Sequence, residues 1–406
     1  MQHRRLLIYS DAHPLGATMQ VRVVCPLDEC GYQTVDAADY HRCPARLRDL
    51  IGHGVDAVVV HRAMRKRCTI YPALLAAARA HRRPVIYDLD DLLFGVHDGH
   101  PDHAFYQARA LHALKPLVDA DLVVASTPPL AGHVSAFHDH VLTAPNRLPE
   151  RSWRPVCQRV LREGRESRGE QLTIGYIGSR THRADLMQVE PAVLALLRRY
   201  RGRVRFLSVG VPLSPGLRRI RFAREIPPPR AVRRDYPRFV RFAEDLPIDI
   251  GIAPLENNPF NRAKSDLKFQ EYAALGVPGV YADLEPYAKR VRPGVTGLLA
   301  EGLSEWVEHL SRLVESPRLR RHIGAQAAGE ILRGWDSCCD ASTWEAILRR
   351  AEGVVRGDRR ASAQQRIAPV VDQIFSYQAE MERRLHRSLR YHVVRGLARL
   401  RRRLAS

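Results

Sequence analysis

The sequence of 406 residues contains only seven cysteines, and their arrangement argues against a disulfide-rich scaffold. No CxxC motif occurs, and the adjacent Cys338 and Cys339 do not have the spacing of a zinc site. We therefore expect reduced thiols, which are typical of a cytosolic protein.

Long hydrophobic runs are also missing. No segment approaches the roughly 18 apolar residues that a membrane span requires. The N-terminal segment MQHRRLLIYSDAH has a basic start but only four apolar residues before Ser10, which is too short for a signal peptide. We predict a cytoplasmic protein, with peripheral binding to the inner face of the membrane as a possibility.

Lysine is scarce although the chain is strongly basic. The 64 basic residues include only five lysines, and with 44 acidic residues the formal net charge is +20. This excess predicts an anionic partner, such as nucleic acid, a phospholipid surface or a phosphate-bearing substrate. Aromatic residues make up only 7%, and the sequence lacks an RNA-recognition consensus, a zinc finger and basic strands with interleaved aromatic residues. A nucleic-acid partner is therefore not expected.

Short apolar runs alternate with helical patterns in both halves of the chain, which predicts doubly wound parallel sheets. In the first half the expected strands are Leu6–Tyr9, Asp56–Val60, Pro84–Tyr87, Leu122–Ala125 and Val141–Thr143, and the clearest helices are Ala45–Ile51, Tyr71–His81 and Phe105–Val118. In the second half the expected strands are Leu172–Ile177, Val204–Val209, Ile220–Ala223, Ile248–Ala253, Gly279–Ala282 and Gly297–Ala300, and the helices are Asp185–Tyr200, Leu267–Leu275, Trp306–Val314 and Pro317–Ile331.

The segment 248–283 is the most informative part of the sequence. Pro254 ends an apolar strand because proline cannot donate to a sheet ladder. After a polar loop, Ser265 or Asp266 can cap a helix, and Gly276 lies where a C-terminal cap belongs. Ligands of parallel sheets lie outside the carboxyl ends of the strands, and the N–H groups of a helix N-terminus suit phosphate.

Two of the five lysines, Lys264 and Lys268, lie four residues apart at the start of this helix. A chain that otherwise uses arginine keeps a compact ammonium group at both positions. Glu271 lies one turn beyond Lys268 on the same helical face. The acid and the base either form a solvated ion pair or project together towards one ligand.

The turn after the expected strand Leu172–Ile177 contains Gly178, Ser179 and Arg180. A glycine turn with a hydroxyl group and a guanidinium can close on phosphate oxygens. The loop after the first strand carries only Gly16, so the GxGxxG fingerprint of NAD-binding proteins is absent.

Three aspartates, Asp88, Asp90 and Asp91, follow the expected strand Pro84–Tyr87. Carboxylates this close repel one another, so such clusters bind a cation, accept hydrogen bonds or act as acid and base. A simpler interpretation is that Asp91 caps the following turn. The histidines of the loop 97–103 do not have the spacing of a helical metal site.

The sequence EYAALGVP at 271–278 resembles the donor-site signature of family 4 glycosyltransferases, which have the GT-B fold, and especially of bacterial enzymes for surface polysaccharides. GYIGSRTH at 175–182 is similar to the family's loop that contacts the donor diphosphate. Pro145 and Asn146 resemble its hinge. The resemblance covers Leu172–Trp344 well and Leu6–Asn146 in outline.

The resemblance implies two Rossmann-like domains that face a cleft, and transfer of a sugar from a nucleotide-diphosphate sugar to a lipid-linked or polysaccharide acceptor. It also implies retention of configuration and no metal or other cofactor. Asp90 or Asp91 would orient or deprotonate the acceptor, and Glu271 would bind the ribose. The residues expected to hold the diphosphate and the sugar are Gly178, Ser179, Arg180, Lys264, Ser265 and Lys268.

The DxD spacing at Asp88 and Asp90 also occurs in a metal-binding motif of the other large glycosyltransferase fold, but that fold has one nucleotide-type domain whereas two are expected here. Many relatives carry a second glutamate at the position of Ala263, so a catalytically inactive GT-B scaffold is an alternative. Gly16 and Arg22 belong to the region that approaches the acceptor and the donor sugar in the family.

We expect an acceptor-side domain at 1–146, a linker at 147–171 with a helix around Gln158–Arg165, a nucleotide-sugar domain at 172–345 and a crossing helix with a basic tail at 346–406. The segment 359–406 contains 12 arginines and three acidic residues, with apolar residues at three- and four-residue steps. This pattern predicts one or two basic amphipathic helices. They can lie on an anionic membrane surface, pair with another helix or cover the first domain.

Overall fold

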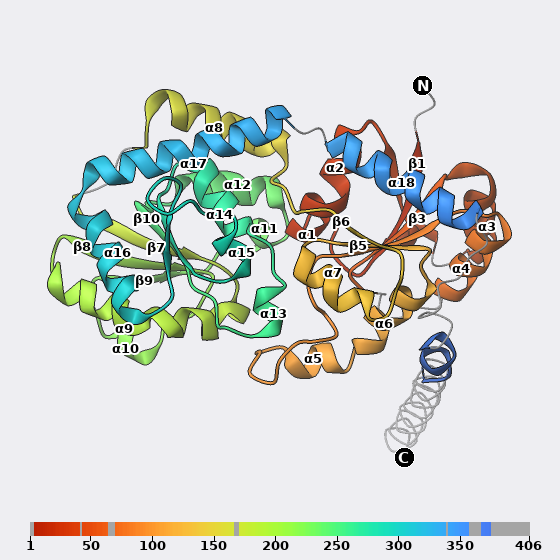
Figure 1. Ribbon diagram of the computed structural model, residues 1–406, viewed down its shortest axis with the longest axis horizontal. Coiled ribbons are helices and arrows are strands. Elements are labelled where there is room, and N and C mark those ends of the chain that lie inside the picture. Colours follow the sequence, from red (N-terminus) through yellow and green to blue (C-terminus); the bar gives the residue numbers. More distant parts are fainter. Residues whose placement is uncertain are drawn as a thin grey trace, which may run out of the picture.

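The computed structural model describes residues 4–40, 43–63, 70–165, 170–337, 340–356 and 367–374. These residues form two six-stranded parallel sheets surrounded by helices (Figure 1). The prediction of two Rossmann-like doubly wound domains is therefore confirmed.

The first sheet has the strand order β2-β1-β3-β4-β5-β6. Side chains alternate between two cores along its strands, so that Leu7 and Tyr9 pack on one face and Leu6 and Ile8 on the other. The sequence did not predict β2, because its four residues QTVD form an exposed edge without an apolar run. The strands are β1 (Arg5–Ser10), β2 (Gln33–Asp36), β3 (Ala57–His61), β4 (Val85–Leu89), β5 (Leu122–Ala125) and β6 (Val141–Thr143).

One expected helix of the first domain is divided in two. Phe105–Val118 was predicted to be continuous, but α5 ends before Arg109, whose side chain turns to Asp11 with an Nη1–Oδ2 distance of 2.8 Å. The helices of this domain are α1 (Ala17–Met19), η1 (Gln20–Val24), α2 (Cys25–Glu29), η2 (Ala37–Tyr40), α3 (Pro44–Asp49), η3 (Leu50–Gly54), α4 (Tyr71–Ala80), α5 (His103–Gln107), α6 (Ala110–Asp119) and α7 (Pro128–Ser135).

The second sheet has the order β12-β11-β10-β7-β8-β9, which is the order of a dinucleotide-binding Rossmann sheet. Strand β9 begins where the predicted strand Ile220–Ala223 ends, because Ile220 and Phe222 pack against the core before the pairing with β8 starts. The strands are β7 (Leu172–Ile177), β8 (Val204–Val209), β9 (Ala223–Ile226), β10 (Ile250–Ala253), β11 (Gly279–Ala282) and β12 (Leu298–Ala300).

The segment expected to be a linker contains a long helix that packs on the second domain. Trp153, Val156 and Cys157 of this helix, α8, belong to the core around the second sheet. The helices of this domain are α8 (Glu150–Glu163), η4 (Arg180–His182), α9 (Arg183–Arg199), α10 (Pro215–Arg218), α11 (Arg230–Arg233), α12 (Tyr236–Asp245), α13 (Pro259–Arg262), α14 (Leu267–Ala274), α15 (Glu285–Ala288), α16 (Leu303–Glu315) and α17 (Pro317–Ser337).

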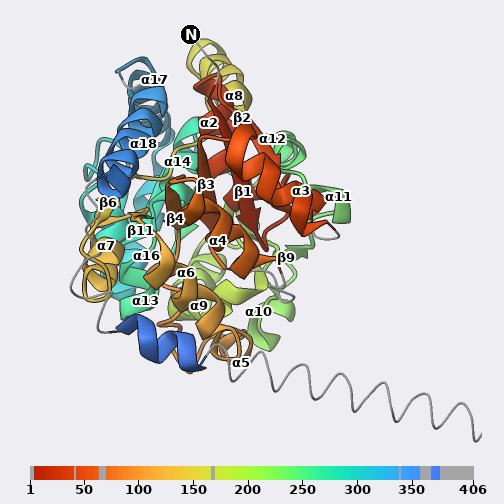
Figure 2. The same ribbon diagram turned by 90° about the vertical axis from the view of Figure 1, so that its right-hand side faces the viewer.

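Helix α18 (Asp340–Arg356) returns the chain to the first domain, where it lies beside α2 (Figure 2). Its residues Trp344, Ile347 and Leu348 pack against one face of the first sheet. The residues 367–374 are also helical, and within them Asp372 lies 2.8 Å from Lys115 of α6. The rest of the predicted basic tail lies outside the described residues. Among the described helices, none has the length and apolar character needed to cross a membrane.

Candidate functional site

The predicted phosphate-binding segments follow two neighbouring strands of the second sheet. The Gly178 turn follows β7, and the loop 254–265 follows β10. These two strands flank the point at which the order of the sheet reverses. In open parallel sheets this switch point forms the crevice where ligands bind.

Lys268 joins these two segments. Its ammonium nitrogen donates a hydrogen bond of 2.6 Å to the carbonyl oxygen of Ile177 and lies 5.2 Å from the ring centroid of Tyr176. Burial lowers the pKa of Lys268, although the nearby carboxyl of Glu271 opposes this effect. The start of α14 and the turn after β7 are therefore in direct contact.

The backbone of Gly210 packs closely against the Gly178 turn. Gly210 has a φ of 81°, and a Cβ atom at this position would lie 2.1 Å from the carbonyl oxygen of Gly178. Only glycine fits this position without moving the turn.

The carboxyl group of Glu271 is partly withdrawn from solvent. Burial raises its pKa to about 7, while the ammonium of Lys268 pulls the pKa down. The phenol of Tyr236 is within electrostatic range of this carboxyl, and the backbone N–H of Tyr236 donates to the carbonyl of Leu15 in the first domain at 2.9 Å. Glu271 thus lies near the boundary between the domains.

Lys264 lies between acidic groups of both domains. Its ammonium nitrogen is 3.9 Å from Asp185 Oδ2 and 4.9 Å from the ring centroid of Phe260. Burial lowers the pKa of Lys264, whereas Asp185 and, across the domain boundary, Asp91 raise it. The two lysines and the acidic residues therefore form one electrostatic group.

Sequence reasoning missed Asp185, which organises this group. Its Oδ1 accepts hydrogen bonds from the backbone N–H of Glu256 at 2.9 Å and from the side chain of Asn261 at 2.8 Å. Its Oδ2 lies 2.8 Å from Nδ1 of His182. Burial and the two lysines lower the pKa of His182 to about 3, so its imidazole is neutral. The position of Asp185 in the first turn of a helix behind a glycine turn was the signal that could have identified it.

Ser265 and Asp266 were expected to cap α14, but neither side chain makes that bond. Asp266 is the N-cap residue, yet its carboxylate accepts from Gln270 at 2.7 Å and from Arg290 at 3.2 Å. The hydroxyl of Ser265 instead accepts a hydrogen bond of 2.8 Å from the side-chain amide of Asn146. The first N–H groups of α14 therefore have no side-chain cap, which leaves them for a ligand.

Arg180, predicted to bind phosphate, pairs here with Asp102 of the first domain. The Arg180 side chain is 65% exposed, so the guanidinium can move without losing buried contacts. Ser179 forms a hydrogen bond of 2.6 Å with the hydroxyl of Thr181. The exposed side chain of Arg180 thus connects the Gly178 turn to the first domain.

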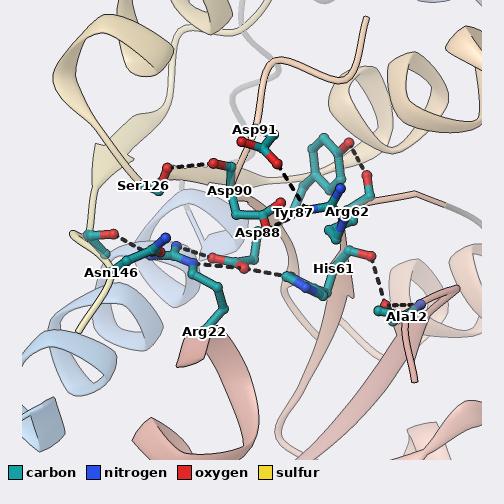
Figure 3. A network of polar contacts seen from close by, with 12 residues as sticks. Ala12, Arg22, His61, Arg62, Tyr87, Asp88, Asp90, Asp91, Ser126 and Asn146 are labelled. Carbon is teal, nitrogen blue, oxygen red and sulfur yellow. Dashed lines mark hydrogen bonds and ion pairs between the residues drawn. The ribbon is translucent and has the colours of Figure 1, made fainter. Parts of the chain in front are cut away.

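A buried ionic network lies at the carboxyl end of the first sheet (Figure 3). Arg22 forms an ion pair with Asp88, and its Nη1 donates to Asn146 Oδ1 at 3.1 Å. The other oxygen of Asp88 lies 2.8 Å from Nδ1 of His61. These contacts lower the pKa of Asp88 despite its burial. Asp88 is therefore a supporting residue that is shielded from ligands.

The predicted catalytic aspartates are gathered by Arg62. Its guanidinium pairs with Asp90 and lies 3.3 Å from Asp91 Oδ2 (Figure 3). Burial and the neighbouring Asp90 raise the pKa of Asp91 to about 6. One oxygen of Asp90, Oδ1, is buried without a hydrogen-bond partner. Asp91 is the more exposed of the two carboxylates, with 29% of its side chain exposed against 7%.

Ala263, the position at which the resemblance would place a second glutamate, is enclosed by the first domain. The residue is fully buried, and its carbonyl accepts a hydrogen bond of 2.7 Å from Thr127. The neighbouring Phe260 packs in the same core and contacts the rings of His97 and His100. The histidine loop therefore has a packing role. In the described residues, no three His, Cys, Asp or Glu side chains form a group that could hold a metal.

Solved structures share this two-domain architecture. Anabaena HepE, in complex with UDP and glucose, is 14% identical with a TM-score of 0.56, covering 86% of this chain and 100% of its own. The α,α-trehalose 6-phosphate synthase of Burkholderia multivorans is 14% identical with a TM-score of 0.52, covering 89% and 99%. The sucrose-phosphate synthase of Thermosynechococcus elongatus is 12% identical with a TM-score of 0.55, covering 86% and 99%.

These similar structures are GT-B glycosyltransferases, so the predicted GT-B fold is confirmed. No protein-family model matches the sequence. No curated protein matches it either.

Proposed function

We propose that this GT-B chain is a glycosyltransferase that takes a sugar from a nucleotide-diphosphate sugar and transfers it to a lipid-linked or polysaccharide acceptor. The observation that carries the proposal is the contact between Lys268 and Ile177. It brings the Gly178 turn, the uncapped start of α14 and Glu271 to one place at the switch point of the second sheet.

The positively charged side chains at this switch point can bind a diphosphate. The ammonium of Lys268 bonds the carbonyl just before the Gly178 turn, and that of Lys264 lies beside Asp185 at the start of the helix that follows the turn. The exposed guanidinium of Arg180 needs only to exchange Asp102 for a phosphate. Positive side chains and helix N–H groups stabilise the charge that develops on a leaving diphosphate. They supply this stabilisation from the protein itself, which is the basis for proposing transfer without a metal.

Glu271 is proposed to bind the ribose hydroxyl groups of the donor. A carboxylate accepts two hydrogen bonds from neighbouring hydroxyls, and the GT-B protein HepE has been solved with UDP and with UDP-glucose. In this assignment the second domain binds the nucleotide and the first domain binds the acceptor.

Asp91 is proposed to orient or deprotonate the acceptor hydroxyl. Its pKa of about 6 allows it to hold or release a proton near neutral pH, and its range of interaction extends to Lys264 of the donor group. Asp90 holds Arg62 in place beside it.

Thermal unfolding with nucleotide sugars tests the donor assignment. A ligand that binds only the folded chain raises its melting temperature. We expect one of the UDP-, GDP-, ADP- or CDP-sugars to raise it, and the Glu271→Ala variant to lose the shift. No shift with any of the four would contradict the proposal.

Retention and metal independence are tested separately. The anomeric configuration of the product tests retention, and turnover in the presence of EDTA tests metal independence.

A catalytically inactive GT-B scaffold is the second candidate, favoured by the enclosure of Ala263. Such a protein would bind the nucleotide without hydrolysing or transferring the donor sugar. Prolonged incubation with the stabilising nucleotide sugar, followed by measurement of released nucleotide, separates the two candidates.

We also propose that the protein works in the cytoplasm at the inner membrane face, to which the basic segment 359–406 attaches it, and that it serves surface-polysaccharide synthesis. Co-sedimentation of the full chain with anionic vesicles tests this attachment.

A further inference from the structure

A small cavity of about 90 Å³ opens on the first domain beside the aspartate cluster. Its walls combine charged and aromatic side chains with apolar ones. The charged and aromatic residues among them are Asp11, Arg62, Phe105, Tyr106 and Arg109.

Each arginine of the cavity already has a carboxylate partner. Arg109 lies 2.8 Å from Asp11, and Arg62 pairs with Asp90 and Asp91. The three carboxylates therefore outnumber the two guanidinium groups when Asp91 is ionised, and equal them when Asp91 is protonated. The cavity offers fixed donors and acceptors of hydrogen bonds but no spare positive charge for a phosphate.

Phe105 gives the cavity an unusual apolar wall. The residue is 54% exposed although it is a large aromatic. The guanidinium of Arg109 lies 5.1 Å from its ring centroid, and the ring of Tyr106 meets it edge-on at 5.4 Å. These contacts hold an exposed ring in a fixed orientation at the rim.

Arg62 occupies its place at a cost in backbone energy. Its φ of 61° is uncommon for a residue with a side chain. Its N–H donates to the carbonyl of Asp88 at 2.9 Å, and its own carbonyl accepts from the hydroxyl of Tyr87. Strained residues that the surroundings hold in place are concentrated at functional sites.

We infer that this cavity and its exposed rim form the subsite for an unphosphorylated sugar unit of the acceptor, which stacks on Phe105 and directs its hydroxyl groups to Asp11, Arg62 and Arg109 in the cavity. A sugar ring presents a C–H face that packs on an aromatic ring and hydroxyl groups that pair with carboxylate and guanidinium groups. The inference rests on the proposed function, since it assumes that the first domain binds the acceptor.

The position of Tyr106 connects this subsite to the proposed chemistry. Its phenol is within electrostatic range of Arg62, Asp90 and Asp91, and burial raises its pKa. Arg62 supplies the geometric link, because it lines the cavity and its Nη1 lies 3.3 Å from Asp91 Oδ2. A sugar unit held by Arg62 would therefore lie near the carboxyl of Asp91, as transfer to one of its hydroxyls requires.

Saturation-transfer NMR on the full chain without donor tests the inference. The probes are methyl α- and β-glycosides of glucose, galactose and mannose, with hexose 6-phosphates as the charged comparison. We expect at least one glycoside to bind and the phosphates to bind no better. Phe105→Ala should weaken glycoside binding by about tenfold. Met187→Ala, which removes a side chain of similar exposure from α9 in the second domain, should leave binding unchanged.

Equal binding to wild type and Phe105→Ala would overturn the inference. So would the absence of glycoside binding, or binding of the phosphates alone. The thermal shift with nucleotide sugar is measured on the same variants and should be the same in Phe105→Ala as in wild type. If no nucleotide sugar shifts the melting temperature of wild type, the donor proposal is contradicted. Glycoside binding that depends on Phe105 would still support the sugar subsite.

Discussion

The side-chain amide of Asn146 donates a hydrogen bond of 2.8 Å to the hydroxyl of Ser265, which is 119 residues further along the chain. Asn146 also accepts from Arg22, and its carbonyl accepts from Gln270 of α14 at 2.9 Å. The point at which the chain leaves the first domain is therefore bonded both to the ionic network around Asp88 and to the start of the proposed donor helix.

Replacing Asn146 with alanine should uncouple these two groups. The variant loses the hydrogen bonds of the Asn146 side chain to the buried Arg22 and the half-buried Ser265, each worth about 1 kcal/mol, and leaves a cavity between the two domains' segments. We expect a decrease of about 2–3 kcal/mol in the free energy of unfolding by urea. Asn257→Ala removes an exposed bond to Arg262 and should change it by less than 0.5 kcal/mol, about the size of surface effects. Equal changes in the free energy of unfolding of both variants would show that the hydrogen bonds of Asn146 stabilise the fold no more than an exposed bond does.

Lys268→Ala should abolish sugar transfer and leave the fold intact. We expect transfer to fall by about 100-fold or more, because the ammonium stabilises the leaving diphosphate. The circular dichroism spectrum should not change. Lys289→Ala removes an exposed lysine that directly follows α15 in the sequence, and it serves as the matched control. Similar rates for both variants would remove Lys268 from the site.

Glu271 should give stability a characteristic dependence on pH. Its pKa is about 7 in the folded chain against an ordinary value of 4.5, so the folded state holds the proton over this range. The free energy of unfolding therefore falls as the pH rises from about 4.5 to 7. Because the side chain is partly exposed, we expect a change of about 1 kcal/mol.

The Glu271→Gln variant checks this assignment. It should lose that part of the pH dependence, because glutamine cannot titrate, and it should also bind the nucleotide sugar weakly at every pH. Parallel stability curves for wild type and variant between pH 4.5 and 7 would contradict the assigned pKa of Glu271.

Asp91→Asn should lower turnover by about 100-fold or more, if the carboxylate takes part in proton transfer. In wild type, kcat should rise as the pH passes through about 6, the pKa of Asp91. Asn cannot titrate, so the variant should lose this step in the pH profile. The KM for the donor should stay the same. An unchanged pH profile in the variant would assign the step to another group.

Ala263→Glu tests whether this position can accommodate the glutamate that the family resemblance would place there. The position is fully buried against the first domain, so a glutamate would bury a charge without a partner. We expect the two domains to separate at this point and the free energy of unfolding to fall by several kcal/mol. Small-angle scattering should show a larger radius of gyration. A compact variant of wild-type stability would mean that the loop around Ala263 adapts.

The fold and the positions of the two proposed donor segments within it were predictable because their signals are local. Apolar runs mark the strands, and glycine at positions 178 and 276 marks the turn and the end of α14. The contact of Lys268 with Ile177 follows from the topology, since adjacent parallel strands end at one edge.

The remaining features depend on pairs that are distant in the sequence. Nothing around Ala263 in the sequence indicates that Thr127 will bind its carbonyl, and nothing around Arg180 indicates Asp102. The role of Asp185 also appears only when Glu256 and Asn261, more than 70 residues further along the chain, are brought to it within the second domain. The contacts of Ala263 and Arg180 arise from the docking of the two domains, and those of Asp185 from the packing of two loops, neither of which local periodicity encodes.

The return of α18 to the first sheet makes the second domain a contiguous insertion in the first. The chain enters it near Leu148 and leaves it after Trp335, and the indole of Trp335 donates a hydrogen bond of 3.1 Å to the carbonyl of Leu148. The two passages thus run side by side. A protease cut in one of them would leave both domains attached through the other, and any opening motion must pivot about this double joint.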